Sequence, residues 1–415
     1  NNFVKNIATI SLTAAVIILP GSYSRAAILS CVICCFLFAI KYEERFRIFI
    51  FEHKLPVTLV LIVLSFGAYK YKQGSADGRI FIDKISVQML FPNHFFGVGI
   101  GNYAGKYGEA QCKYFREKLS STMEYSSIHR IEHERMIADC PDLAFNDYLQ
   151  IGVESGLLAM ILYIVTIIVA VILSIKRQTI WGYGILAFSI FSLFSCPIEK
   201  FQFQLLFAIL LAMSSDGTCR ENSSKSVYFF LLPIFFSMIF VLVNSRSWRE
   251  QMDDRREWID AGKWYDNEYY EFVISDYSQL FDGLKNNSQF LYEYGFSLNK
   301  MNYFDKSDSI LMMGAKISSN PMFWNVMGNN SLALGRYREA EERYKHAFYM
   351  VPNRLYPLTL IVKLYYVEGD TVNFIDMYEN ALSFVPKVES PNTERLRKEI
   401  TDLYNCLSDL RLSEN

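Results

Sequence analysis

The sequence predicts an all-α protein, in which a polytopic transmembrane helix bundle is followed by an α-solenoid. Two observations lead to this fold class. Residues 1–243 consist mostly of apolar runs, whereas residues 244–415 are mixed in polarity and, from Pro321 onward, repeat with a period of 34. An apolar run of about 20 residues crosses a bilayer as a helix. Helical repeats of that length stack to bury a continuous core.

The apolar runs predict seven membrane spans, and one of them is long enough to project beyond the bilayer. The run 200–213 is short for a span, whereas 144–174 exceeds the required length. The chain begins at Asn1 inside an apolar run without a charged leader, so we read it as lacking upstream spans rather than as starting with a signal peptide. The predicted spans are 4–20, 24–40, 55–70, 144–174, 180–196, 200–213 and 226–244.

The distribution of basic residues orients these spans. One set of short loops carries most of the lysines and arginines, including Lys41, Arg45 and Lys176, and the other set has little beyond Arg25 and Lys200. Basic loops stay in the cytoplasm. We therefore expect the loop 71–143 and the C-terminal half to lie outside the cytoplasm. The surrounding lipids are partners of such a chain, and a net charge of −2 gives no reason to expect nucleic acid.

Two of the eight cysteines, Cys112 and Cys140, lie in the non-cytoplasmic loop. An oxidising compartment permits a disulfide there, which would stabilise the fold by about 3 kcal/mol. The alternative is two unrelated thiols. We expect no metal site, because the cysteines at 31–35 lie inside a span, where they act as small apolar residues.

The C-terminal half repeats small, aromatic and proline positions. Gly335, Tyr344, Ala347 and Pro352 recur as Gly369, Tyr378, Ala381 and Pro386. The unit FWNVMGNNSLALGRYREAEERYKHAFYMVPN resembles the tetratricopeptide repeat. Such a solenoid binds partners on its concave face, so a protein or glycan-assembly partner is expected, with pure scaffolding as the alternative.

Three segments of the N-terminal half carry polar residues where a bilayer disfavours them. Arg25 begins a span at its outer end. The segment DGRIFIDKISVQMLFPNHFFGVGIGNY at 77–103 predicts an interfacial helix followed by a glycine turn. The segment AFNDYLQIGVESG at 144–156 places Asn146, Gln150 and Glu154 on one helical face.

In this order, the three segments resemble the O-antigen ligase and polysaccharide polymerase superfamily of bacterial inner-membrane proteins, over residues 1–243. The resemblance implies glycan transfer on the periplasmic face, from an undecaprenyl-diphosphate carrier to a hydroxyl group of lipid A core, another glycan or a protein. It implies no metal and no other cofactor. A tetratricopeptide domain at the C-terminus also occurs in this family.

The resemblance also implies roles for residues. Arg25 and Arg79 would clamp the diphosphate, although each could instead contact lipid head groups. The histidine that usually precedes the motif asparagine is replaced by Phe145, which cannot accept a proton. Glu154 and Asp147 are candidate substitutes for that base. The other substrate-binding candidates are Asn146, Gln150, Gly99 and Asn102.

A second hypothesis is a non-catalytic assembly protein of surface polysaccharide export, acting through its repeat domain with a lapsed site at Phe145. A transporter ranks last, because the sequence shows no paired broken helices with charges at the bilayer midplane.

Overall fold

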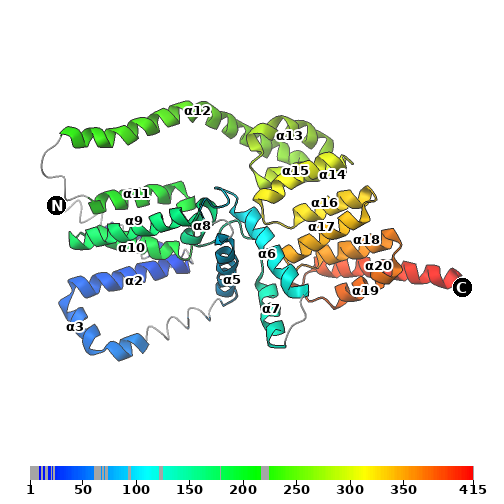
Figure 1. The fold of residues 1–415 in the computed structure, drawn as a ribbon, viewed down its shortest axis with the longest axis horizontal. Helices are drawn as coiled ribbons and strands as arrows, with labels where there is room; N and C mark the ends of the chain where they lie inside the picture. Colours follow the sequence, from blue (N-terminus) through cyan, green and yellow to red (C-terminus); the bar gives the residue numbers. More distant parts are fainter. Residues whose placement is uncertain are drawn as a thin grey trace. The chain divides into compact units, whose positions relative to one another are not determined.

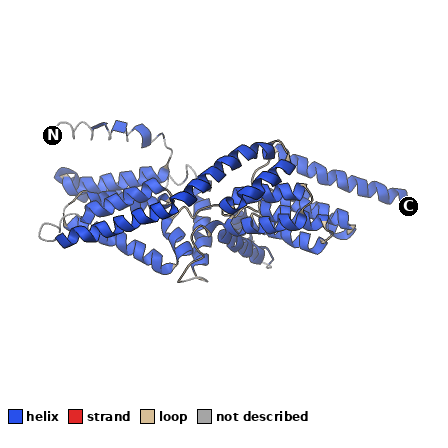
Figure 2. Cartoon of the chain, turned by 90° about the horizontal axis from the view of Figure 1, so that it is seen from above, coloured by secondary structure: helices blue, strands red, loops and turns tan. Residues whose placement is uncertain are grey.

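The computed structural model describes residues 24–59, 73–91, 95–120, 125–177, 179–215 and 224–414, with a few further residues before 24 and between 60 and 72. Every regular element within these ranges is a helix, and none of the described residues forms a strand (Figure 2). This confirms the predicted all-α class.

The chain divides into two compact units, each made of two stretches of sequence. The N-terminal unit comprises Asn1–Gly99 and Leu143–Asn222, and the C-terminal unit comprises Ile100–Asp142 and Ser223–Asn415. The structure thus divides the chain differently from the predicted boundary between 243 and 244. It also separates the predicted loop 71–143, because residues 73–90 fold with the N-terminal unit and residues 100–142 with the C-terminal unit.

Four apolar helices of the N-terminal unit run side by side (Figure 1). They are α2 (Arg25–Tyr42), α9 (Leu157–Lys176), α10 (Trp181–Ser192) and α11 (Phe201–Ser215). Ile167, Ile185, Phe188 and Phe207 pack between α9, α10 and α11. The remaining elements are α3 (Glu44–Glu52), α5 (Gln73–Leu90), α8 (Asp147–Ser155) and the 3-10 turn η1 (Pro197–Glu199).

Among the described residues, α2 and α9 are long and apolar enough to cross a membrane. Large apolar side chains of α9, including Leu158, Leu162 and Ile168, are exposed, which suits contact with lipid. The predicted spans 180–196 and 200–213 correspond to the shorter apolar helices α10 and α11. The span 226–244 falls within α12 (Ser224–Asp266), and 4–20 and 55–70 lie largely outside the described residues.

The prediction of one continuous helix over 144–174 is wrong, because two helices, α8 and α9, meet at Gly156. This glycine has a φ of 91°, a conformation that side chains disfavour. A Cβ at Gly156 would also lie 2.1 Å from the carbonyl oxygen of Phe95. The candidate span therefore begins at Leu157, and α8 is a separate short helix before it.

The C-terminal unit is built from consecutive helices that pack in pairs (Figure 1). Small residues permit the close approach: a Cβ at Gly328 would lie 2.3 Å from the Tyr344 ring, and one at Gly314 would lie 2.1 Å from the Phe323 ring. The assignment to the tetratricopeptide class stays a prediction. The helices are α6 (Tyr103–Ser120), α7 (Tyr125–Ile137), α12, α13 (Tyr270–Leu284), α14 (Ser288–Lys300), α15 (Phe304–Ile317), α16 (Met322–Ala333), α17 (Tyr337–Met350), α18 (Tyr356–Glu368), α19 (Thr371–Ser383) and α20 (Pro391–Glu414).

Within this unit, the segment Ile100–Asp142 is fastened to the repeat helices by buried polar contacts. The Arg135 guanidinium donates to the carbonyl oxygens of Pro352 at 3.1 Å and Val385 at 3.0 Å. In return, the Asn353 amide donates to the carbonyl oxygens of Arg135 at 2.9 Å and Ala138 at 2.8 Å. These bonds satisfy backbone groups that burial would otherwise leave unpaired, so this part of the loop is an integral layer of the C-terminal unit.

Candidate functional site

The two predicted clamp arginines meet at one helix of the N-terminal unit. Arg25 begins α2, and its Nη2 donates to the Ser75 hydroxyl of α5 at 3.0 Å. Arg79 lies one turn further along α5, and its Nη1 donates to the Phe194 carbonyl oxygen at 2.7 Å. Because Ser75, Arg79 and Asp83 are each four residues apart, they share one face of α5.

The pKa of Arg79 reflects the nearby charge of Arg25. Burial lowers the pKa of Arg79, and the charge of Arg25 lowers it further, while the carboxyl group of Asp83 opposes both effects. Arg25 also stands at the N-terminus of an 18-residue helix, where the helix dipole adds positive potential. Two adjacent cations at such a position favour an anionic ligand.

The segment before α8 contacts this cationic face. The Arg79 guanidinium lies 5.3 Å from the centre of the Phe145 ring, within the range of a cation–π interaction. Phe145 has a φ of 54°, a left-handed conformation that costs a non-glycine residue about 1–3 kcal/mol. The residue in the usual histidine position is therefore held against Arg79 by a strained backbone.

Asn146 caps α8 and reaches Asp83. Its Oδ1 accepts from the backbone N–H groups of Tyr148 at 3.1 Å and Leu149 at 3.3 Å. Its side chain is also hydrogen-bonded to Asp83. Since Oδ1 accepts and the carboxylate cannot donate, the Asn146 amide nitrogen is the donor. A helix cap thus links α8 to the polar face of α5.

The glycine turn lies against the other end of α8. The N–H groups of Val98 and Gly99 donate to the carbonyl oxygens of Val153 and Glu154, each at 2.9 Å. These bonds satisfy carbonyls that the end of a helix leaves unpaired. A Cβ at Gly97 would lie 2.4 Å from the Glu154 carbonyl oxygen. The second and third motifs are therefore one interlocked structure, and Gly99 contributes its backbone.

Three other polar residues of α8, Asp147, Gln150 and Glu154, are buried. Asp147 is 1% exposed, and its Oδ2 accepts from the Ile198 N–H at 3.4 Å. Gln150 accepts from the Ala144 N–H at 2.8 Å through its Oε1 and so fixes the segment before the helix. Glu154 is 7% exposed. Of the three residues expected to share one face, Asn146 caps the helix. Gln150 is hydrogen-bonded to the backbone before the helix, and Glu154 is a buried acid.

The remaining predicted residues belong to the C-terminal unit. The Asn102 carbonyl accepts from the Lys106 N–H at 3.2 Å, and a substrate role for Asn102 stays a prediction. The predicted disulfide is not formed, because Cys112 and Cys140 are both free. Cys112 lies 3.7 Å from the His346 carbonyl oxygen, and Cys140 accepts from Arg354 at 3.3 Å. Burial raises the pKa of Cys112 to about 11, so this thiol is protonated and unreactive.

Sequence reasoning missed two side chains at the site, Asp83 and Cys196. Asp83 could have been found, because it follows the predicted clamp residue Arg79 by one helical turn. Cys196 receives hydrogen bonds from the backbone N–H groups of Phe145 and Asn146. No local sequence pattern predicts this position for Cys196, because its contacts come from a segment about 50 residues earlier.

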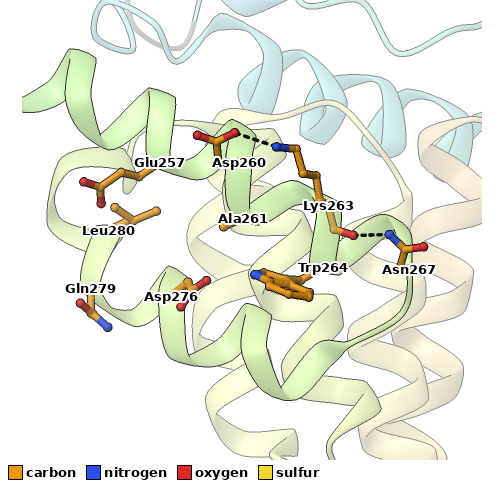
Figure 3. A pocket seen from close by; sticks show the side chains of 9 residues that line it. All are labelled: Glu257, Asp260, Ala261, Lys263, Trp264, Asn267, Asp276, Gln279 and Leu280. Atoms are coloured by element: carbon orange, nitrogen blue, oxygen red, sulfur yellow. Dashed lines mark hydrogen bonds and ion pairs between the residues drawn. The ribbon is translucent and has the colours of Figure 1, made fainter.

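The C-terminal unit has a separate hollow between α12 and α13, with a volume of about 600 Å³. Figure 3 shows the side chains that line it. Carboxyl groups of Glu257, Asp260 and Asp276 surround it, and Lys263 forms an ion pair with Asp260 at 2.9 Å. The exposed ring of Trp264 forms part of its wall. This acidic hollow is a candidate binding surface apart from the arginine site.

Residues 10–164 match the family model described as O-antigen ligase. The match covers less than half of the chain, and it includes Arg25, Arg79, the glycine turn and all of α8. No curated protein matches the chain. Over residues 10–164 the chain is thus similar to the O-antigen ligases, a membrane-associated family of glycan ligases and polymerases.

Proposed function

We propose that this protein transfers a glycan from an undecaprenyl-diphosphate carrier to an acceptor hydroxyl on lipid A core, another glycan or a protein. The reaction would take place on the periplasmic face of a bacterial inner membrane and would need no metal. The observation that carries the proposal is that Arg25 of α2 contacts α5 next to Arg79. Both arginines lie inside the segment that matches the O-antigen ligases.

The chemistry requires positive charge where the leaving diphosphate gains negative charge. Guanidinium groups donate paired hydrogen bonds to phosphate oxygens. Arg79 is held by the Phe194 carbonyl and the Phe145 ring, so its position is set before substrate arrives. Preorganised donors of this kind stabilise a transition state without further rearrangement.

The C-terminal unit would bind a partner of the assembly process. Its paired helices fit the predicted tetratricopeptide-like solenoid, a class that binds proteins through exposed surfaces. The acidic hollow at α12 and α13 offers three carboxyl groups beside an exposed indole ring. A basic protein segment or a glycan would suit this composition.

One observation favours the second candidate, a non-catalytic assembly protein. Phe145 occupies the position where the family usually has histidine, and a phenyl ring cannot accept a proton. On this view, the cationic face would bind a lipid-linked glycan without transferring it. Both candidates need the charge of the site, and they differ in whether the protein itself catalyses the transfer.

The test replaces Arg79 with alanine and with lysine in a strain that lacks the chromosomal copy. Removing one preorganised charge donor should reduce transfer by about 10²–10³-fold, while lysine should restore part of it. Surface glycan is followed on a gel, together with the lipid-linked precursor. Arg47→Ala is the matched control, because Arg47 is exposed and pairs only with Glu44 of its own helix among its described contacts. Normal glycan with Arg79→Ala protein present in the membrane would refute the clamp.

A further inference from the structure

We propose that Asp83 is the general base that takes the proton from the acceptor hydroxyl, an inference that rests on the proposed transfer reaction. The placement of Asp83 comes from the periodicity of α5. Ser75, Arg79 and Asp83 lie on one face at four-residue spacing. Ser75 contacts Arg25, Arg79 contacts Phe145, and Asp83 contacts Asn146. The carboxylate of Asp83 therefore lies one helical turn beyond Arg79, on the face of α5 that Arg25 contacts.

Exposure distinguishes Asp83 from Asp147 and Glu154, the two acidic residues predicted to replace the base. The side chains of Asp147 and Glu154 are 1% and 7% exposed, so an incoming sugar hydroxyl cannot easily reach them. Asp83 is only partly buried. Phe145 offers no basic atom. Asp83 lies on the same face of α5 as Arg79. Its carboxyl group is accessible to a substrate, and its orientation is fixed.

Asn146 supplies that orientation. Its amide donates to Asp83 while its carbonyl oxygen is occupied by two backbone N–H groups of α8. The cap therefore fixes which way the amide faces, and the amide fixes the carboxylate. Two oxygens with about four lone-pair directions leave Asp83 able to accept another hydrogen bond, which the acceptor hydroxyl would provide.

The proposed step balances in atoms and charge. The acceptor oxygen forms a bond to the anomeric carbon of the donor sugar, and its proton passes to the Asp83 carboxylate. The bond between the anomeric carbon and the diphosphate oxygen breaks, and its electron pair leaves with the undecaprenyl diphosphate. Arg25 and Arg79 hold that charge. Asp83 then returns the proton to water.

The ionisation of Asp83 suits this work. Burial raises its pKa to about 6, against the lowering effects of Asn146 and Arg79. The charged group that acts on it directly is Arg79 on α5, and Arg25 on α2 acts in turn on Arg79. Because a base must be deprotonated, transfer should rise with pH through about 6 and level off above 7.

The experiment measures transfer in membranes of the deletion strain carrying each variant, with the host's own lipid-linked glycan and acceptor as the probe, from pH 5 to 8. Asp83→Asn should lower the rate by about 10²–10⁴-fold and abolish the rise near pH 6. Asp83→Glu should retain part of the activity with a pH-dependent profile. Asp77→Asn, an acidic residue elsewhere on α5, should behave like the native protein.

Arg79→Ala, measured in parallel, separates the two proposals. If Asp83→Asn keeps a near-native rate and pH profile while Arg79→Ala abolishes transfer, Asp83 is not the base and the proposed function stands. If deleting the protein leaves transfer unchanged, the proposed function fails. Should Asp83→Asn not accumulate, the native profile decides, because a rate that does not change between pH 5 and 7 overturns the assignment.

Discussion

Replacing Arg135 with alanine should release the loop layer of the C-terminal unit from the repeat helices. Arg135 is 7% exposed, donates to the carbonyl oxygens of Pro352 and Val385, and lies 4.8 Å from the centre of the Phe384 ring. Each hydrogen bond to a charged group contributes about 1.5–3 kcal/mol. Since water can occupy part of the vacated space, we expect a loss of about 3 kcal/mol, near the lower end of the two bonds combined.

Hydrogen exchange of the full-length protein in detergent measures this loss directly. A change of about 3 kcal/mol corresponds to roughly a hundredfold increase in the open population, so the amides of α7 should exchange about a hundredfold faster. Arg130→Ala is the control on the same helix. Its side chain is 75% exposed and pairs with Glu134 at 3.5 Å, which predicts a change below about 0.5 kcal/mol. Unchanged protection of α7 in the Arg135 variant would refute the anchoring role.

Two further predictions concern the glycine turn and the thiols. Gly97→Ala should lower the free energy of unfolding by more than about 2 kcal/mol, because φ is +67° and the new Cβ would lie 2.4 Å from the Glu154 carbonyl oxygen. The control is Gly74→Ala, which has nothing within 4 Å of the new Cβ and should not destabilise the protein. Thermal unfolding compares the two variants. Cys112 and Cys140 are free, so both should be alkylated after unfolding without reductant; peptide mapping that finds them joined would restore the predicted bridge.

The helical class and the paired C-terminal helices followed from periodicity, since apolar runs and recurring small residues are local signals. The break at Gly156 did not. Its cause is the close approach of Phe95, which lies 61 residues earlier and leaves no trace in the apolar pattern around 144–174. The division of the loop 71–143 between two units escaped prediction for the same reason. Contacts such as Asn353 with Arg135 join residues more than 200 positions apart.

At the site, the structure supplies the hydrogen-bond partners of the predicted residues, which the sequence could not show. Asn146, Gln150 and Gly99 looked like substrate contacts, yet their polar groups cap or brace α8. These bonds hold α8 in place, and a substrate role for the three residues stays a prediction. Arg25 and Arg79, which meet beside α5, are both partly exposed. Chemistry at this site is therefore best sought on the polar face of α5, and the α8 motif is best understood as the structure that holds that face in place.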